Sequence, residues 1–350
     1  MRSLNPAFLA TLSLTPEQAS VLRRLGEYKG KQELYSRQTP EILESLKQSA
    51  IIESSESSPR IEGAVAPHER VVALVGRSTE PRDRSEREIA GYRDALALIH
   101  ESARHMELTP NVIRQIHSIL YRYMPQSGGR WKATQNDIVE KDSRGTILRV
   151  RFSTLSPVAT PQAMDDLTAR YHEAVATERY EPLLLVPLAI LDFLCIHPFT
   201  DGNGRVARLL TLMLLYHLDY QVGRFISLER IFEESKETYY ETLESSSRGW
   251  HEGAHDVFPW VDYFWGVLLR AYAEFEERVG IIRTTWGSKT QQVRMAVDRR
   301  IGPFSIAQIA RDCPRISRVM IKNVLGKLRD EGVISLEGRG RGARWVREMK

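Results

Sequence analysis

The chain has 350 residues, of which 42% are hydrophobic and 27% charged, and this composition excludes an intrinsically disordered protein. A chain of this length is too long for one ordinary hydrophobic core and predicts two or three domains. The net charge is +4, yet residues 289–350 carry about 15 Lys and Arg against about 6 Asp and Glu. An acidic body is therefore followed by a basic tail, which predicts two kinds of partner.

The sequence predicts a cytoplasmic protein without membrane spans. Residues 1–18 lack the basic segment and apolar stretch of a secretory signal. The longest apolar run, residues 183–196, contains Pro187 and Asp192 and is too short to cross a bilayer, so we expect a buried helix there. Cys195 and Cys313 belong to no spaced ligand cluster and are expected to be reduced core residues.

Apolar spacings of three and four predict a mainly helical fold. The expected helices cover residues 15–29, 39–56, 84–105, 109–123, 161–177, 182–196, 203–219, 227–245 and 257–285. Thr15 is the expected N-cap of the first helix, and Thr39-Pro40 precedes the second. The polar segment 54–60 is expected to act as a short connector.

Residues 138–152 break the helical pattern. Two alternating runs joined by Asp-Ser-Arg-Gly at 142–145 predict a β-hairpin. The alternation of the second run places Leu148, Val150 and Phe152 on one face and the intervening Arg149 and Arg151 on the other.

Residues 288–350 are expected to form a separate, small α+β domain. Ser305 and Gln308 form a capping box, and Ser317 caps a second helix that closes at Gly332. Runs 333–336 and 343–346 can then pair as strands, which completes a winged-helix pattern. Basic side chains could meet DNA phosphates at Arg318, Lys322, Lys327, Arg339, Arg341 and Arg344. Contact with another protein is the open alternative.

The segment 197–208, HPFTDGNGRVAR, has the features of an anion site. A glycine-rich loop before a helix presents free backbone N–H groups, and the helix dipole adds to their attraction for phosphate. Gly202 and Gly204 lack a Cβ, so a phosphate chain can approach the backbone closely. Arg205 and Arg208 supply guanidinium groups that match phosphate oxygens.

Two further side chains of this segment predict phosphoryl-group chemistry. Asp201 is a hard oxygen ligand suited to Mg²⁺ that bridges phosphates. His197 is the group whose ordinary pKa lets it accept a proton near neutrality. Together with the anion site they predict transfer of a phosphate-containing group.

The segment resembles the signature of the Fic family, His-Pro-Phe-x-(Asp/Glu)-Gly-Asn-Gly-Arg-x-x-Arg, at about nine fixed positions, and the likeness extends over residues 50–285. The resemblance implies a helical Fic catalytic domain at 84–285, after an N-terminal helical region at 1–83. It implies transfer of AMP from ATP to a Ser, Thr or Tyr hydroxyl of a target protein, or of the enzyme itself. His197 would be the general base, and Asp201 would bind Mg²⁺ on the ATP phosphates.

The resemblance also implies roles for the other site residues. Gly202, Asn203 and Gly204 would form the anion hole, and Arg205 and Arg208 would hold the outer phosphates, with Arg208 facing the γ-phosphate. The hairpin 138–152 would be the flap that pairs with the target segment by strand addition, although a purely structural hairpin is the alternative. Tyr240, more than Tyr239, resembles the adenine-pocket tyrosine, where a core role is the alternative.

Upstream, Ser58-Pro-Arg-Ile-Glu62-Gly63 resembles the inhibitory motif of the family. If this segment packs against the site, Glu62 can pair with Arg208 and remove the group that should orient the γ-phosphate. ATP would then bind with its α-phosphate turned away from in-line attack. The resemblance therefore implies an autoinhibited enzyme.

Other functions stay open at this point. Some Fic relatives transfer phosphate or phosphocholine, but the retention of Gly202, Gly204 and Arg205 favours AMP. Removal of AMP from a modified protein, with Glu62 orienting a water, also fits the residues. A different class is a DNA-binding regulator whose Fic core is secondary. The sequence names neither the target protein nor its acceptor residue, and it leaves open whether the chain is a monomer or a dimer.

Overall fold

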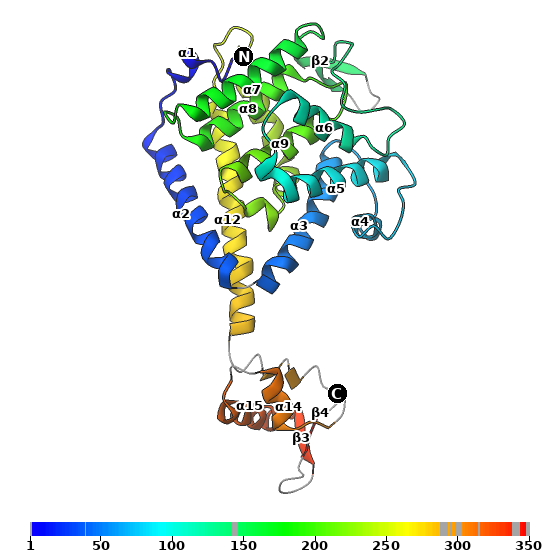
Figure 1. Ribbon diagram of the computed structural model, residues 1–350, viewed down its shortest axis with the longest axis vertical. Coiled ribbons are helices and arrows are strands. Elements are labelled where there is room, and N and C mark those ends of the chain that lie inside the picture. The colour runs from blue at the N-terminus through cyan, green and yellow to red at the C-terminus, as the bar shows by residue number, and fades with distance from the viewer. Residues whose placement is uncertain are drawn as a thin grey trace. The chain divides into compact units, whose positions relative to one another are not determined.

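The computed structural model describes residues 2–38, 40–141, 146–287, 293–294, 296–297, 303–313, 316–337 and 344–347. It divides into two compact units, Met1–Phe275 and Glu276–Lys350. The expected region 1–83 is not a unit of its own, because it lies within the first of these. The second unit begins earlier than the expected residue 288. The prediction of a mainly helical fold is confirmed (Figure 1).

The first unit is mainly helical, and its last helix, α12 (Phe258–Gly287), continues past the boundary at Phe275. Its helices are α1 Pro6–Leu9, α2 Pro16–Gln38, α3 Pro40–Ile61, α4 His68–Val75, α5 Arg84–Ser102, α6 Pro110–Leu120, α7 Thr160–Ala176, α8 Pro182–Ile196, α9 Asn203–His217, α10 Leu228–Glu234, α11 Lys236–Ser247 and α12. Short 3-10 turns lie at Ala103–His105 and Val222–Arg224. Among the described residues no helix is both long and apolar enough to cross a membrane.

Several helical details differ from the prediction. Helix α3 continues through residues 54–60, where the sequence predicted a connector, because Ser54, Ser55 and Ser58 are buried against neighbouring helices. Helix α4 was not predicted. The expected helix 227–245 is two helices divided at Ser235, whose hydroxyl donates to the Ile231 carbonyl at 2.7 Å.

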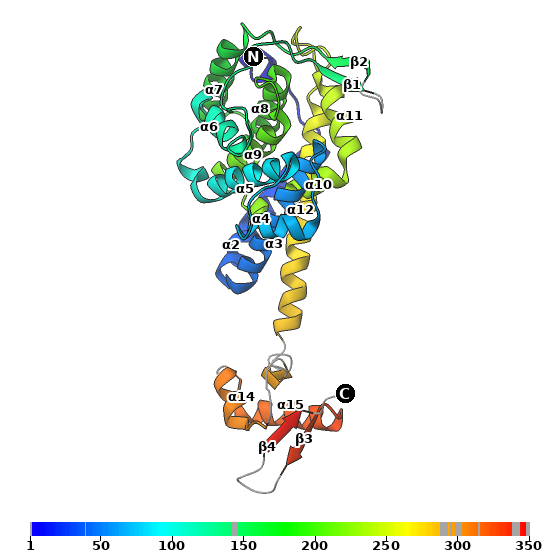
Figure 2. The same cartoon turned by 90° about the vertical axis from the view of Figure 1, so that its right-hand side faces the viewer.

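Helices α8 and α9 form the centre of the first unit. Helix α9 contacts α3, α5, α6 and α8 (Figure 1 and Figure 2). Pro187 inside α8 has no N–H for the carbonyl of Leu183, four residues earlier. The indole N–H of Trp265 on α12 donates to that carbonyl at 3.0 Å. The buried helix therefore keeps its proline without an unpaired carbonyl.

The predicted hairpin is confirmed. Strand β1, Ile138–Lys141, pairs antiparallel with β2, Ile147–Phe152, with Val139 opposite Val150 and two irregularities in register. The turn at 142–145 lies outside the described residues. Leu148 and Val150 are exposed, whereas Phe152 stacks on His251 with ring centroids 5.2 Å apart.

Between residues 303 and 347, the described part of the second unit has two helices followed by a hairpin. Helix α14, Ile306–Asp312, begins with the predicted Ser305 capping box. Helix α15, Arg318–Asp330, is capped by Ser317 as expected. Strands β3, Ile334–Glu337, and β4, Arg344–Arg347, are antiparallel. Phe304 and Trp345 also exchange two backbone hydrogen bonds of 2.8 Å. The hairpin tip, with Arg339 and Arg341, lies outside the described residues.

Candidate active site

His197 stands at the end of α8 in a conformation that turns the chain sharply. Its φ and ψ are 53° and 59°, in the left-handed region that non-glycine residues rarely adopt. Its Nδ1 lies 3.2 Å from the Leu194 carbonyl oxygen. A carbonyl oxygen can only accept, so Nδ1 carries the proton and Nε2 keeps its lone pair. Burial, assisted by the charge of Lys132, lowers the pKa of His197 to about 4, so the ring is neutral at pH 7.

The loop after His197 is fixed by hydrogen bonds within the chain. The Asn203 side chain accepts from the Phe199 N–H at 2.9 Å and donates to the Phe199 carbonyl at 2.7 Å. The Phe199 ring is buried and stacks on His117 with centroids 3.8 Å apart. The side chain of Asn203 therefore shapes the loop, and only its backbone N–H is available to the predicted anion hole.

His117 ties this loop to the segment before the hairpin. The Gly129 N–H donates to Nδ1 of His117 at 2.8 Å, so Nε2 carries the proton and donates to the Asp201 carbonyl at 3.0 Å. Burial lowers the pKa of His117 to about 4, which keeps this tautomer neutral. The backbone carbonyl that precedes Gly202 is thus positioned by a side chain distant in sequence.

Lys132 and Asn136 also hold the loop, and the sequence analysis missed both. The buried Lys132 ammonium donates to the Ile196 carbonyl at 3.1 Å and to Asn136 Oδ1 at 2.8 Å. Asn136 Nδ2 donates to the Phe199 carbonyl at 2.6 Å. Burial lowers the pKa of Lys132 to about 8. A single Lys and Asn in a polar loop carry no local signal of this role.

The first turn of α9 offers an anion site. The N–H groups of Asn203, Gly204 and Arg205 have no intrahelical acceptor, and the helix dipole adds partial positive charge there. Gly202, which precedes the helix, has φ 82°, and a Cβ on it would lie 3.0 Å from the Tyr121 ring. A Cβ on Gly204 would lie 2.2 Å from Glu62 Oε1. A side chain at Gly202 would therefore be strained, and a side chain at Gly204 would have to displace the end of Glu62.

Asp201 lies at the edge of the cavity with its side chain 51% exposed. Its Oδ1 accepts from the Gly202 N–H at 2.7 Å and lies 3.4 Å from Arg205 Nη2, and Arg84 approaches its Oδ2 to 3.6 Å. Burial alone would raise its pKa, but Arg205 and these other partners lower it. Asp201 is therefore charged at neutral pH.

A single carboxylate here fits Mg²⁺ that comes with a nucleotide. Within the described part of the chain no three His, Cys, Asp or Glu side chains converge on a metal position. Mg²⁺ needs no such cluster, because it is usually held by one or two carboxylates together with substrate phosphates. The charged and half-exposed Asp201 meets that requirement.

Arg205, a predicted phosphate contact, is not among the residues that line the cavity. Its side chain is 2% exposed, and its Nη1 donates to Glu88 Oε2 on α5 at 2.8 Å. The guanidinium carbon lies 5.8 Å from the centre of the Tyr121 ring. In this conformation Arg205 anchors α9 to α5 and supports Asp201.

Arg208 forms hydrogen bonds with two of the predicted regulatory residues, Ser58 and Glu62. Its side chain is 2% exposed, and its Nε and Nη2 donate to the hydroxyl and carbonyl of Ser58 at 2.8 and 2.9 Å. Nη2 also donates to Glu62 Oε1 at 3.0 Å. Burial lowers the pKa of Arg208, but the Glu62 carboxylate raises it overall. Gly63 follows with φ 93°, the left-handed conformation that ends many helices.

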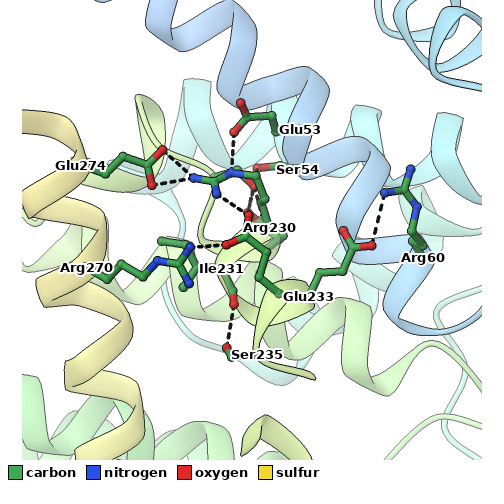
Figure 3. Close-up of polar contacts among 12 residues, drawn as sticks. Glu53, Ser54, Arg60, Arg230, Ile231, Glu233, Ser235, Arg270 and Glu274 are labelled. Carbon is green, nitrogen blue, oxygen red and sulfur yellow. Dashed lines mark hydrogen bonds and ion pairs between the residues drawn. The ribbon is translucent and has the colours of Figure 1, made fainter. Parts of the chain in front are cut away.

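Ion pairs attach α3 to the neighbouring helix α10. Ser58 lies near the C-terminal end of α3, and Glu62 directly follows that helix. Figure 3 shows Arg230 of α10 between Glu53 of α3, at 3.0 Å, and Glu274 of α12, at 2.6 Å. Arg60 of α3 pairs with Glu233 at 3.2 Å. These contacts place the end of α3 over the site.

A cavity of about 670 Å³ brings the site together. Its walls include Glu62, His197, Asp201 and the first residues of α9. Tyr239 and Tyr240 of α11 form another wall, and the Lys236 ammonium lies 6.0 Å from the Tyr240 ring centre. Lys236 also donates to the Ile61 carbonyl at the end of α3, at 2.7 Å. The volume suits a nucleotide-sized ligand.

The hairpin closes the cavity on its remaining side. Ile138, Val139 and Phe152 line it. Arg149 links the hairpin to α11, because it donates to Glu140 at 2.7 Å and to Glu244 at 3.2 Å.

Comparisons with known proteins agree with this geometry. Residues 107–215 match the family model described as Fic/DOC family. Over 206 residues the chain is 25% identical to "Protein adenylyltransferase fic-1" of Caenorhabditis elegans, covering 58% of this chain and 35% of the relative. For the Caenorhabditis briggsae protein of the same name the values are 23% over 209 residues, 59% and 36%. The chain thus spans about a third of the length of the curated relatives it matches.

Solved structures share the fold. A Fic family protein from Desulfovibrio desulfuricans G20 has a TM-score of 0.68 at 19% identity, covering 97% of this chain and 98% of its own. Fic-1 from Caenorhabditis elegans has a TM-score of 0.59 at 20% identity, covering 76% of this chain and 73% of its own. These likenesses extend the shared fold beyond the matched segment.

Proposed function

The chain carries a Fic domain with the site of a Fic-type transferase, and from this premise we propose that it moves AMP from ATP onto a protein hydroxyl. The observation that carries the proposal is the meeting of three groups on one cavity: neutral His197, charged Asp201 and the open first turn of α9. This is a base, a place for a cation and a place for phosphate.

The proposed reaction begins with a Ser, Thr or Tyr hydroxyl beside His197. Nε2 accepts the hydroxyl proton as the oxygen attacks the α-phosphorus, so a new P–O bond forms. The bond between the α-phosphorus and the bridging oxygen breaks, and pyrophosphate leaves with its electron pair. Backbone N–H groups at the start of α9 stabilise the charge on the phosphate oxygens. Asp201 would hold Mg²⁺, which neutralises phosphate charge when bound.

The choice of AMP over phosphate rests on how the nucleotide would lie. Gly202 and Gly204 leave the backbone open to a phosphate chain, and Tyr240 offers a ring on another wall of the cavity. An adenine against Tyr240 with phosphates at α9 would place the α-phosphate, rather than the γ-phosphate, toward His197. The names of the two curated relatives support the same reaction.

The target would bind along the hairpin. In the described part of the two-stranded sheet β2 pairs only with β1, so its other edge is available for strand addition. Exposed Ile147, Leu148 and Val150 on β2 offer apolar contacts to such a segment. Backbone pairing would present a hydroxyl to His197 with loose sequence selectivity.

We further propose that the protein rests in an inhibited state. The Glu62 carboxylate lies where a Cβ of Gly204 would be, which is the space that a phosphate at the α9 N-terminus would need. It also occupies Arg208 through a hydrogen bond of 3.0 Å. The Glu62 carboxylate and a γ-phosphate would repel each other if both lay at Arg208 and the start of α9. Glu62 would therefore have to move before ATP could bind in the orientation needed for transfer.

The test uses ATP labelled at either the α- or the γ-phosphate, with the purified protein and Mg²⁺. Self-modification should retain the α label, lose the γ label, and raise the intact mass by one AMP. His197→Ala should lower the rate by about 10²–10⁴-fold. His172→Ala is the control, because His172 also contacts a backbone carbonyl, at Leu108, but lies outside the cavity. Retention of the γ label, or full activity of His197→Ala, would refute the proposal.

A further inference from the structure

The outward face of α15 in the second unit carries groups that no role in the transferase site explains. The inward face is apolar, with Ile321, Val324, Leu325 and Leu328 buried in the core of the unit. The opposite face is exposed and carries Arg318, Val319, Lys322, Asn323 and Lys327. Helix α15 thus packs against the core of the unit on one side and is exposed on the other.

This face has positive charge without compensation. Residues 313–329 contain no Asp or Glu. The next carboxylates are already paired, Asp330 with Arg329 at 2.9 Å and Glu331 with Arg294. Arg318, Lys322 and Lys327 make no ion pair with any described residue. They lie on the exposed surface of the helix over roughly 14 Å of its length, with Arg318 and Lys327 on opposite flanks.

From this face we infer that the second unit binds duplex DNA, with α15 in the major groove. An α-helix fits that groove, which is about 12 Å wide. Arg and Asn side chains can each bond a base edge through two hydrogen bonds, and an aliphatic group can contact a thymine methyl. Arg318, Asn323 and Val319 supply these three types, and Val319 is 71% exposed.

The neighbouring elements suit the same partner. Helix α14 contacts α15 and precedes it in the chain, the order in which a helix–turn–helix places its recognition helix second. Arg344 on β4 is exposed and offers a phosphate contact from the hairpin.

Other macromolecules fit this face less well. The cores of protein–protein interfaces are poor in Lys and rich in aromatic side chains, and the exposed face of α15 has two lysines and no aromatic residue. Single-stranded nucleic acid needs aromatic rings for stacking. The major groove of double-stranded RNA is too narrow for side chains to read. Duplex DNA is therefore the partner to test.

The experiment measures binding of the full-length protein, freed of nucleic acid, to a fluorescent random-sequence DNA duplex by anisotropy over a series of NaCl concentrations. The logarithm of the association constant should fall linearly with the logarithm of salt, by about 0.9 per neutralised phosphate, hence a slope of about −4 for Arg318, Lys322, Lys327 and Arg344. The double variant Arg318→Ala with Lys322→Ala should reduce the slope by about 2. Arg329→Ala on the same helix should leave it unchanged, because that side chain is paired with Asp330.

A second variant keeps the test independent of simple charge loss. Val319→Asp puts a carboxylate on the exposed face without touching the core, so it should melt like the wild type yet lose duplex binding. Three results would overturn the inference: no binding at the lowest salt, a wild-type slope in the double variant, or tighter binding of single-stranded DNA or RNA than of the duplex. Each outcome is separate from AMP transfer, because no varied residue lines the cavity.

Discussion

Replacing Glu62 by Gly should activate the enzyme by roughly ten- to a hundredfold in self-AMPylation. The carboxylate is about one-third exposed and bonds an Arg208 side chain that is 2% exposed, at 3.0 Å. A charge-assisted hydrogen bond of this kind contributes about 1.5–3 kcal/mol, and each 1.36 kcal/mol is a factor of ten. Partial solvent exposure of Glu62 favours the lower part of that range. The substitution would open the space above Gly204 and remove one of the three hydrogen bonds that hold Arg208, so that only the two to Ser58 remain.

The assay follows incorporation of α-labelled AMP with time for the wild type, Glu62→Gly and Glu62→Gln. Glu62→Gln keeps the length of the side chain and one oxygen acceptor, so it should activate less than Glu62→Gly. Combining Glu62→Gly with Arg208→Ala should remove the gain, because the freed cation is then absent. Melting temperatures measured in parallel separate activation from unfolding.

Two results would refute this reasoning. Glu62→Gly might leave the rate of AMP transfer unchanged, which would mean that the carboxylate does not obstruct the nucleotide. Alternatively, the double variant could be as active as Glu62→Gly, and Arg208 would then have no part in the release. If Glu62→Gly instead stopped the removal of AMP from a modified target, Glu62 would belong to a hydrolytic site.

Four further predictions concern the metal, the base, the fold and the attachment of α3. Asp201→Asn should abolish Mg²⁺-dependent transfer without lowering the melting temperature of the nucleotide-free protein; a large drop in melting temperature would show a structural role. Because the pKa of His197 is lowered to about 4, the neutral base is fully present above about pH 6, and transfer should fall only as the pH drops toward 4; an inflection near 6.5 in a pH–rate profile would contradict this. Trp265→Phe should cost about 1–3 kcal/mol in urea unfolding, because it leaves the buried Leu183 carbonyl without a donor. Arg230→Met should raise basal AMP transfer by roughly two- to fivefold, since a partly screened ion pair contributes up to about 1 kcal/mol to holding α3; an unchanged rate would show that these pairs do not restrain it.

The parts of the fold that could be predicted are those with a strong local signal. The apolar run of α8 and the glycines before α9 mark both helices and the loop between them. The capping residues Ser305 and Ser317 start α14 and α15 where the sequence placed them. In these segments the chain's local preferences and its tertiary contacts favour the same structure.

The serine-rich end of α3 shows why other parts could not be predicted. Ser54 and Ser58 have modest helix propensity and usually favour caps or turns, so residues 54–60 have the composition of a connector. In the structure Ser54 donates to Glu229 at 2.7 Å and Ser58 accepts from Arg208 at 2.8 Å, across 175 and 150 residues. These partners come from α9 and α10, and local sequence contains no information about them.

The two arginines of α9 show the corresponding limit within the site. Residue type predicted that Arg205 and Arg208 would both hold phosphates, yet both are 2% exposed, and they turn to different helices. Arg205 meets a carboxylate of α5, which leaves it attached to the scaffold. Arg208 meets the end of α3, whose attachment depends on ion pairs that can be broken. An arginine that is paired with a fixed helix, as Arg205 is with α5, stabilises the fold. An arginine that is paired with a segment able to move, as Arg208 is with the end of α3, can become available to bind phosphate. In the proposed inhibited state, Arg208 is therefore the residue whose release would activate the site, and the end of α3 is the element that would have to move.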